Sequence, residues 1–141
     1  MTDRASGYPV THEDWNEITD NFDAVQPIAL NLILSAGILT SGYKGHIQSP
    51  INFTIATVTT AGSSAGNSTI YIYVGGTLPL GIGDSIVGTA PIALSGTAVD
   101  IKSTFTGWSG TAITAGQWIG INVSSAGTIA AVTMSIVGNR T

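Results

Sequence analysis

Very few side chains in this sequence could carry out acid–base chemistry. Beyond residue 23 the charged residues are Lys44, Asp84, Asp100, Lys102 and Arg140. A hydrolytic site with two carboxylates would therefore require the fold to bring Asp84 and Asp100 together. A simpler interpretation is that Asp84, within GIGDSIVG, caps a turn, and that Asp100 lies with Lys102 on one strand face in water.

The other catalytic residue types are equally sparse. His12 and His46 are the only histidines, and neither has a second metal-type ligand at the spacing of a helix or strand site. Cysteine is absent, which excludes disulfides, thiolate metal sites and cysteine nucleophiles. A serine triad would have to recruit one of the two histidines. We therefore expect a protein that is not an enzyme and that has neither a metal site nor a cofactor.

Aromatic side chains are the remaining candidates for contact with a ligand. In NSTIYIYVGG, Tyr71 and Tyr73 alternate with aliphatic residues, so a strand would place both tyrosines on the face away from the core. Trp108 and Trp118 flank the stretch SGTAITAGQ. Rings on a polar strand face can stack on sugars, and they can equally fill a core or a subunit interface. These four residues are our candidates for carbohydrate or interface contact.

The small number of charged residues and their distribution argue against some classes of function. Only 9% of the residues are charged, against about 25% in an average soluble domain. Such a surface is covered by Ser, Thr, Asn and Gly, by neighbouring subunits, or by both. Four Lys and Arg residues, scattered along the chain, leave no basic patch for nucleic acid. The acidic start of the chain lacks the features of a signal peptide, so we expect synthesis and assembly in a cytoplasm.

Residues 1–27 are expected to form an N-terminal anchoring and oligomerisation segment with a short α-helix. Thr11 is a suitable N-cap, and Pro27 ends the pattern. One side of the helix would be an apolar stripe of Trp15, Ile18, Phe22 and Val25. This stripe could pack on its own domain, pair with the same segment of neighbouring subunits as in a coiled coil, or dock on a larger particle.

Residues 28–141 have the pattern of an all-β domain. Alternating runs predict strands near Ile51–Ile55, Ile70–Val74, Ser85–Val87, Ile92–Leu94 and Ala98–Phe105. Turn-rich pieces such as TAGSSAGN and GGTLPLGIGD separate them. Many short strands with frequent turns predict a β-sandwich or a barrel.

The stretch Gly116–Gly138 has no charged side chain and is long enough to cross a bilayer. Its residues nevertheless alternate in two runs, one in WIGINVSS and one in IAAVTMSIVG, on either side of the turn-like SSAG. The stretch is therefore predicted to be a β-hairpin around Ser124–Gly127, and membrane insertion is not expected.

The region GWSGTAITAGQWIGINVSSAGTIAAVTMSIVGNR resembles the C-terminal half of small jelly-roll domains in structural proteins of tailed bacteriophages. SPINFTIATV, NSTIYIYV and GDSIVGTAPIALS look like earlier strands of the same module, and VTHEDWNEITDNFDAV is similar to the openings of many phage virion proteins. The resemblance covers about residues 45–140. Gln117 stands where the family commonly has Asp.

This resemblance implies a jelly-roll β-sandwich preceded by a short helix, in a homotrimer on the virion surface. It implies a capsid decoration (cement) or head-fibre protein, attached to capsid or tail proteins through its N-terminal segment. The alternative is a receptor-binding module of a tail fibre or baseplate, whose tyrosines and tryptophans stack on host-surface glycans. A third hypothesis is a small carbohydrate-active enzyme that uses Asp84 and Asp100.

Overall fold

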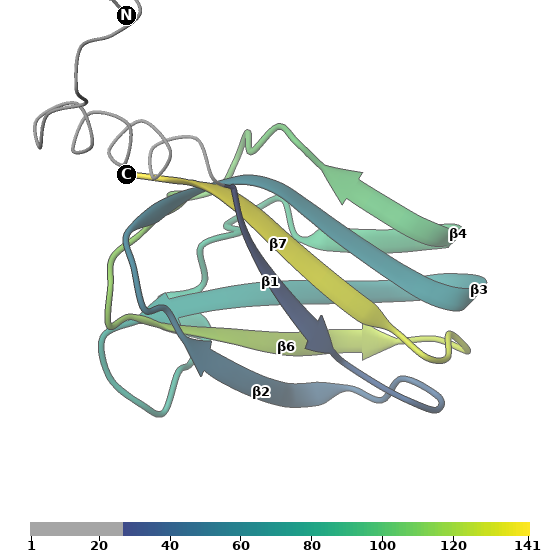
Figure 1. The fold of residues 1–141 in the computed structure, drawn as a ribbon. Coiled ribbons are helices and arrows are strands. Elements are labelled where there is room, and N and C mark those ends of the chain that lie inside the picture. Colours follow the sequence, from purple (N-terminus) through teal and green to yellow (C-terminus); the bar gives the residue numbers. More distant parts are fainter. Residues whose placement is uncertain (1–26) are drawn as a thin grey trace, which may run out of the picture.

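The computed structural model describes residues 27–141, which form an all-β fold (Figure 1). Its elements are β1 (Pro27–Ile33), β2 (Gly42–Gln48), β3 (Phe53–Gly75), the short 3-10 helix η1 (Ile82–Asp84), β4 (Ile92–Lys102), β5 (Ala112–Ile113), β6 (Trp118–Ala126) and β7 (Thr133–Arg140). Every strand pair is antiparallel. The predicted N-terminal helix, with Trp15, Ile18, Phe22 and Val25, lies outside the described residues.

Strand β3 is the central strand of the fold: it is 23 residues long, and each of its halves belongs to a different layer. Its first half, Phe53–Ala61, pairs with β7, and its second half, Ser68–Gly75, pairs with β6. Its other edge pairs with β4 along both halves. Figure 1 shows β3 and β4 turning together at one end of the molecule and running back. One layer thus contains β1, β7, the first half of β3 and the end of β4, and the other contains β2, β6, the second half of β3 and the start of β4.

The bend in β3 falls in TAGSSAGN, where the sequence predicts a turn between two strands. The structure instead keeps this stretch within one strand, and the register against β4 shifts between Ala61 and Gly66. Irregularities of this kind bend a strand and let it pass from one layer to the next. A Cβ on Gly66 would lie 2.7 Å from Cγ1 of Ile129, so the small residue makes room for an aliphatic side chain inside the bend.

The predicted hairpin in Gly116–Gly138 does contain two strands, but its predicted turn and its pairing are wrong. Strand β6 continues through the expected turn to Ala126, β7 begins only at Thr133, and each pairs with a different half of β3. The residues between them cross from one layer to the other, and Ile129 and Val132 within this crossing are fully buried. Alternation identifies a strand with one buried face, and it carries no information about the partner. Among the described residues, no helix has the length and apolarity needed to span a membrane.

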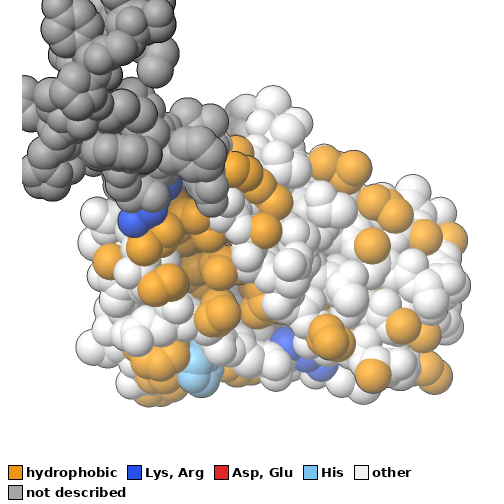
Figure 2. All heavy atoms as spheres, viewed as in Figure 1, with side chains coloured by type: hydrophobic (Ala, Val, Ile, Leu, Met, Phe, Trp, Pro, Cys, Tyr) orange, Lys and Arg blue, Asp and Glu red, His pale blue; other side chains and the backbone are white. Residues whose placement is uncertain are grey.

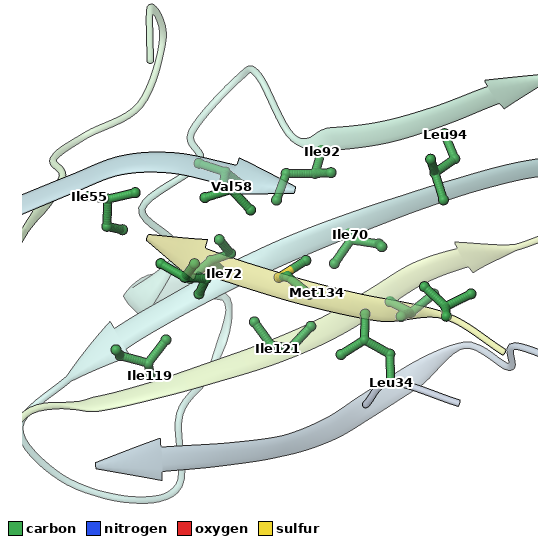
Figure 3. Packing of buried hydrophobic residues seen from close by; sticks show 14 of the residues in the cluster. Leu34, Ile55, Val58, Ile70, Ile72, Ile92, Leu94, Ile119, Ile121 and Met134 are labelled. Atoms are coloured by element: carbon green, nitrogen blue, oxygen red, sulfur yellow. The ribbon is translucent and has the colours of Figure 1, made fainter. Parts of the chain in front are cut away.

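The core lies between the two layers and is built from the inward residue of each alternating pair (Figure 3). Its largest fully buried side chains include Phe53, Leu39, Ile70, Ile72, Ile92, Leu94, Ile119, Ile121, Ile129, Met134, Ile136 and Val58. Burial of each such side chain contributes about 1.5–3 kcal/mol. The core therefore holds the two layers together and leaves the outer face of each for other contacts.

Candidate binding faces

The outer face of the layer that contains β2 carries most of the aromatic candidates. Across the second half of β3, β6 and β2, the register aligns three rows of residues. The rows are Tyr71–Asn122–Tyr43, Tyr73–Gly120–His46 and Gly75–Trp118–Gln48. We name these nine positions the aromatic face.

A β-bulge in β2 brings Tyr43 and His46 onto this face. Residues three apart on a regular strand point to opposite sides. Here the register shifts between Tyr43 and Gly45, so that Lys44 is the extra residue. Gly45 supports the irregular backbone with a φ of 137°. Tyr43 then pairs with Asn122, His46 with Gly120, and both side chains lie on the outer side.

Three rings form a continuous strip along this edge of the sheet. The ring centroids of Tyr43 and His46 are 6.0 Å apart, and those of His46 and Trp118 are 5.0 Å apart in an edge-to-face arrangement. Tyr43 is 43% exposed. Neither Tyr43 nor Trp118 belongs to the core or to the side chains packed against it, whereas Tyr71 and Trp108 do.

Gly120 lies at the centre of the aromatic face, between Tyr73 and His46 in the middle row. A Cβ at this position would stand 2.5 Å from the hydroxyl of Tyr43 and 2.7 Å from Cδ1 of Leu80, which comes from the segment between β3 and β4. Leu80 also approaches Gly75. Asp84, in the same segment, accepts a hydrogen bond at 2.8 Å from the backbone N–H of Gly81, which confirms its expected role as a turn cap.

Tyr73 lies on the predicted side of its strand but is not available to a ligand. It is only 6% exposed. Burial raises the pKa of its phenol above the ordinary value of 10.0, the neighbouring Tyr71 raises it further, and a hydrogen bond from the side chain of Asn122 partly offsets both. Burial also raises the pKa of Tyr43. Tyr73 therefore belongs to the aromatic face by its register but does not offer its ring as a contact surface.

Trp108 is placed away from the aromatic face. Its indole Nε1 donates to the carbonyl of Ala90 at 2.9 Å, and its ring lies 4.7 Å from that of Phe105. Both rings pack against the core. Of the four predicted aromatic candidates, the structure thus brings together Tyr71, Tyr73 and Trp118, and gives Trp108 a structural role.

Asp84 and Asp100 do not converge. Asp84 lies near Gly75 at the end of β3, whereas Asp100 is paired with the buried Thr60 in the first half of that strand. Asp100 and Lys102 share one strand face, as expected, and form an ion pair at 3.8 Å, but the register places this face on the inward side of β4, where both side chains are only partly exposed. The alternation of Val99 and Ile101 with two charged residues predicts the opposite orientation, because apolar residues usually face the core, but Val99 and Ile101 are 49% and 61% exposed. Within residues 27–141 no group of three His, Asp or Glu side chains is placed to hold a metal ion.

A second face, on the opposite layer, has no formal charge. We name it the uncharged face, and it consists of Ala29, Asn31, Ile33, Thr57, Thr59, Ala61, Val99, Ile101, Thr133, Ser135 and Val137, aligned in rows by the register. Ile33 is 75% exposed and Ile101 61%. Figure 2 shows a surface of mainly apolar and uncharged polar atoms, with a few basic and histidine atoms and no acidic side chain in this view.

Comparison of the chain with protein-family models, with curated proteins and with solved structures finds no match. The apolar stripe of Trp15, Ile18, Phe22 and Val25 lies outside the described residues. Tyr43, His46, Gln48 and Asn122 are members of the aromatic face that the sequence pattern did not indicate. For Tyr43 and His46 the sequence does contain a signal of the bulge, namely the glycines Gly42 and Gly45. These two glycines flank the bulge, and both have positive φ.

Proposed function

We propose that this chain is a non-enzymatic structural protein of a phage virion surface, of the capsid decoration or head-fibre type, with a jelly-roll fold. The sequence resemblance over about residues 45–140 motivates the assignment. The observation that carries it is the order in which the strands pair.

If β3 and β4 are each counted as two strands, because each serves two layers, the fold has eight principal strands. The first then pairs with the eighth, the second with the seventh, the third with the sixth and the fourth with the fifth. An eight-stranded double sheet made of such nested antiparallel pairs is the arrangement of jelly rolls, which are frequent in viral capsid proteins and in lectins. This order supports the jelly-roll assignment independently of any sequence motif.

The uncharged face supports assembly into a larger structure. Val99 and Ile101 lie two residues apart on β4 and are 49% and 61% exposed, and Ile33, on β1 at the other edge of the same layer, is 75% exposed. Exposed apolar side chains that share one face favour a contact surface there, because their burial against a partner removes them from water. The partner that we propose is a second copy of the chain, within a homotrimer, with residues 1–27 attaching the trimer to capsid or tail proteins.

Oligomer mass tests the self-association. We expect light scattering of the full chain to give three times the protomer mass of 14.3 kDa. Ile101→Lys should shift the protein to monomers, because it would bury an unpaired charge at the contact. Ile82→Lys, at a 72% exposed position in the segment between β3 and β4, is the matched control and should leave the trimer intact. A monomeric wild-type chain at micromolar concentration would contradict the proposal.

Attachment to the particle is tested separately. Virions assembled with a chain that lacks residues 1–27 should lose this protein from their surface, while the truncated protein stays folded and trimeric in solution. Unchanged occupancy of the virion after this deletion would rule out the N-terminal segment as the anchor.

A further inference from the structure

We propose that the strip of Tyr43, His46 and Trp118 is a stacking surface for neutral pyranose sugars. The proposal does not depend on the virion assignment. It differs from the four-residue candidate set of the sequence pattern, because it removes Tyr71, Tyr73 and Trp108 and adds Tyr43 and His46 of β2.

The first argument is that these rings have no evident role in the stability of the core. Tyr43 and Trp118 lie outside the core cluster, and His46 contacts both rings, so that the strip joins β2 to the start of β6. Among residues 27–141, β2 ends the strand order of the sheet, so no further strand of this part of the chain borders the strip. Tyr43 and His46 are exposed and Trp118 is half-buried, and such a line of rings on a sheet is a pre-formed surface for a flat, partly apolar ligand.

The second argument is the placement of polar groups beside the rings. Asn122 lies between Tyr71 and Tyr43 in its row, and Gln48 is paired with Trp118. The Nε2 of Gln48 donates to the carbonyl of Gly116 at 2.9 Å, which fixes the orientation of its amide. A pyranose presents C–H groups on its ring faces and hydroxyls around its rim. Rings that are flanked by fixed amides match both features.

The third argument is charge. None of the nine positions of the aromatic face is Asp, Glu, Lys or Arg. The nearest base along β2 is the bulge residue Lys44, whose Nζ donates to the hydroxyl of Thr40 at 2.8 Å. Acidic polysaccharides and nucleic acids need several basic contacts. The face therefore fits a neutral sugar, and its open form fits the internal segment of an oligosaccharide chain.

The test is titration of the full-length chain with maltotetraose, cellotetraose and galactotetraose, and a microarray of neutral bacterial glycans. Binding is followed by the Nε1–H signal of Trp118 in NMR spectra. At least one neutral glycan should bind, and Tyr43→Ala should weaken it by about five- to tenfold, since one aromatic contact is lost. Tyr43→Phe, which keeps the ring, should bind nearly as wild type.

Ile101→Ala, on the opposite layer, is the control and should leave sugar affinity unchanged, while Tyr43→Ala should leave the oligomer mass unchanged. The two variants thus separate sugar binding from self-association. The proposal is overturned if no neutral glycan binds at millimolar concentration, if heparin binds in preference, or if Tyr43→Ala alters the oligomer mass and not the sugar affinity.

Discussion

The phenol ring of Tyr43 on β2 lies across the backbone of Gly120 on β6, because Gly120 has no side chain to exclude it. The contact joins residues that are far apart in the sequence, and the β-bulge at Lys44 is what turns Tyr43 toward it. Gly120 is therefore required by the packing of its neighbours and not by its own backbone angles.

Replacement of Gly120 by Ala should displace the Tyr43 ring. The new Cβ would meet the hydroxyl of Tyr43 at 2.5 Å and the end of Leu80 at 2.7 Å, and both side chains can give way. We expect a loss of about 1 kcal/mol in the free energy of unfolding, measured by denaturant titration. Gly76→Ala, where a Cβ meets nothing within 4 Å, is the matched control. Equal stability of the two variants would contradict the contact.

Replacement of Gly138 by Ala should be far more damaging. Its Cβ would lie 2.7 Å from the backbone carbonyl oxygen of Thr54 and closer still to the Phe53 ring, at the point where β7 pairs with β3. Backbone within a sheet cannot move aside as a side-chain end can. We expect a loss of about 3 kcal/mol in the free energy of unfolding. Gly110→Ala, which has open space around its Cβ, should change the melting temperature little, and a similar result for both variants would refute this packing.

Alkaline pH should destabilise the fold through Tyr73. Its pKa is raised in the folded protein, mainly by burial, so the unfolded chain ionises first. The free energy of unfolding should be constant through neutral pH and decline as the pH rises above about 10. Tyr73→Phe should reduce this decline, and Tyr43→Phe combined with it should reduce it further. Denaturant titrations at several pH values measure the slope, and an unchanged slope in the double variant would show that neither phenol is responsible.

Alternation in the sequence located some of the strands: the runs around Ile70, Ile121 and Met134 are all in strands, with these residues in the core. The strand predicted at Ser85–Val87 is wrong, since Ser85 forms only an isolated bridge with Tyr73, and β1 and β2 were not predicted. The partners of these strands could not be predicted, because β6 and β7 satisfy the same pattern whether they pair with each other or with β3. The sequence pattern could not predict the bend of β3 at Gly66 either, because small polar residues are equally suited to a turn and to a bent strand.

The candidate site was predictable only in part, for a similar reason. The outward direction of Tyr71 and Tyr73 follows from strand alternation. The burial of Tyr73 depends on tertiary contacts of its phenol, such as that with Asn122, which local spacing does not encode. A regular strand would place Tyr43 and His46 on opposite faces, whereas the bulge at Lys44 places them on the same face. A single extra residue of this kind cannot be recognised from the periodicity of the sequence.

The pairing of β1 with β7 has a consequence for how the chain reaches its folded state. Pro27 is paired with Asn139, so the partner of β1 is synthesised more than a hundred residues after it. The layer that contains both strands cannot close on the ribosome until residues 133–140 have emerged. Until then the inward residues of β1 and of the first half of β3 remain without their neighbours from β7. Folding is thus dominated by contacts between distant residues, which makes it slow and leaves the nascent chain exposed to aggregation.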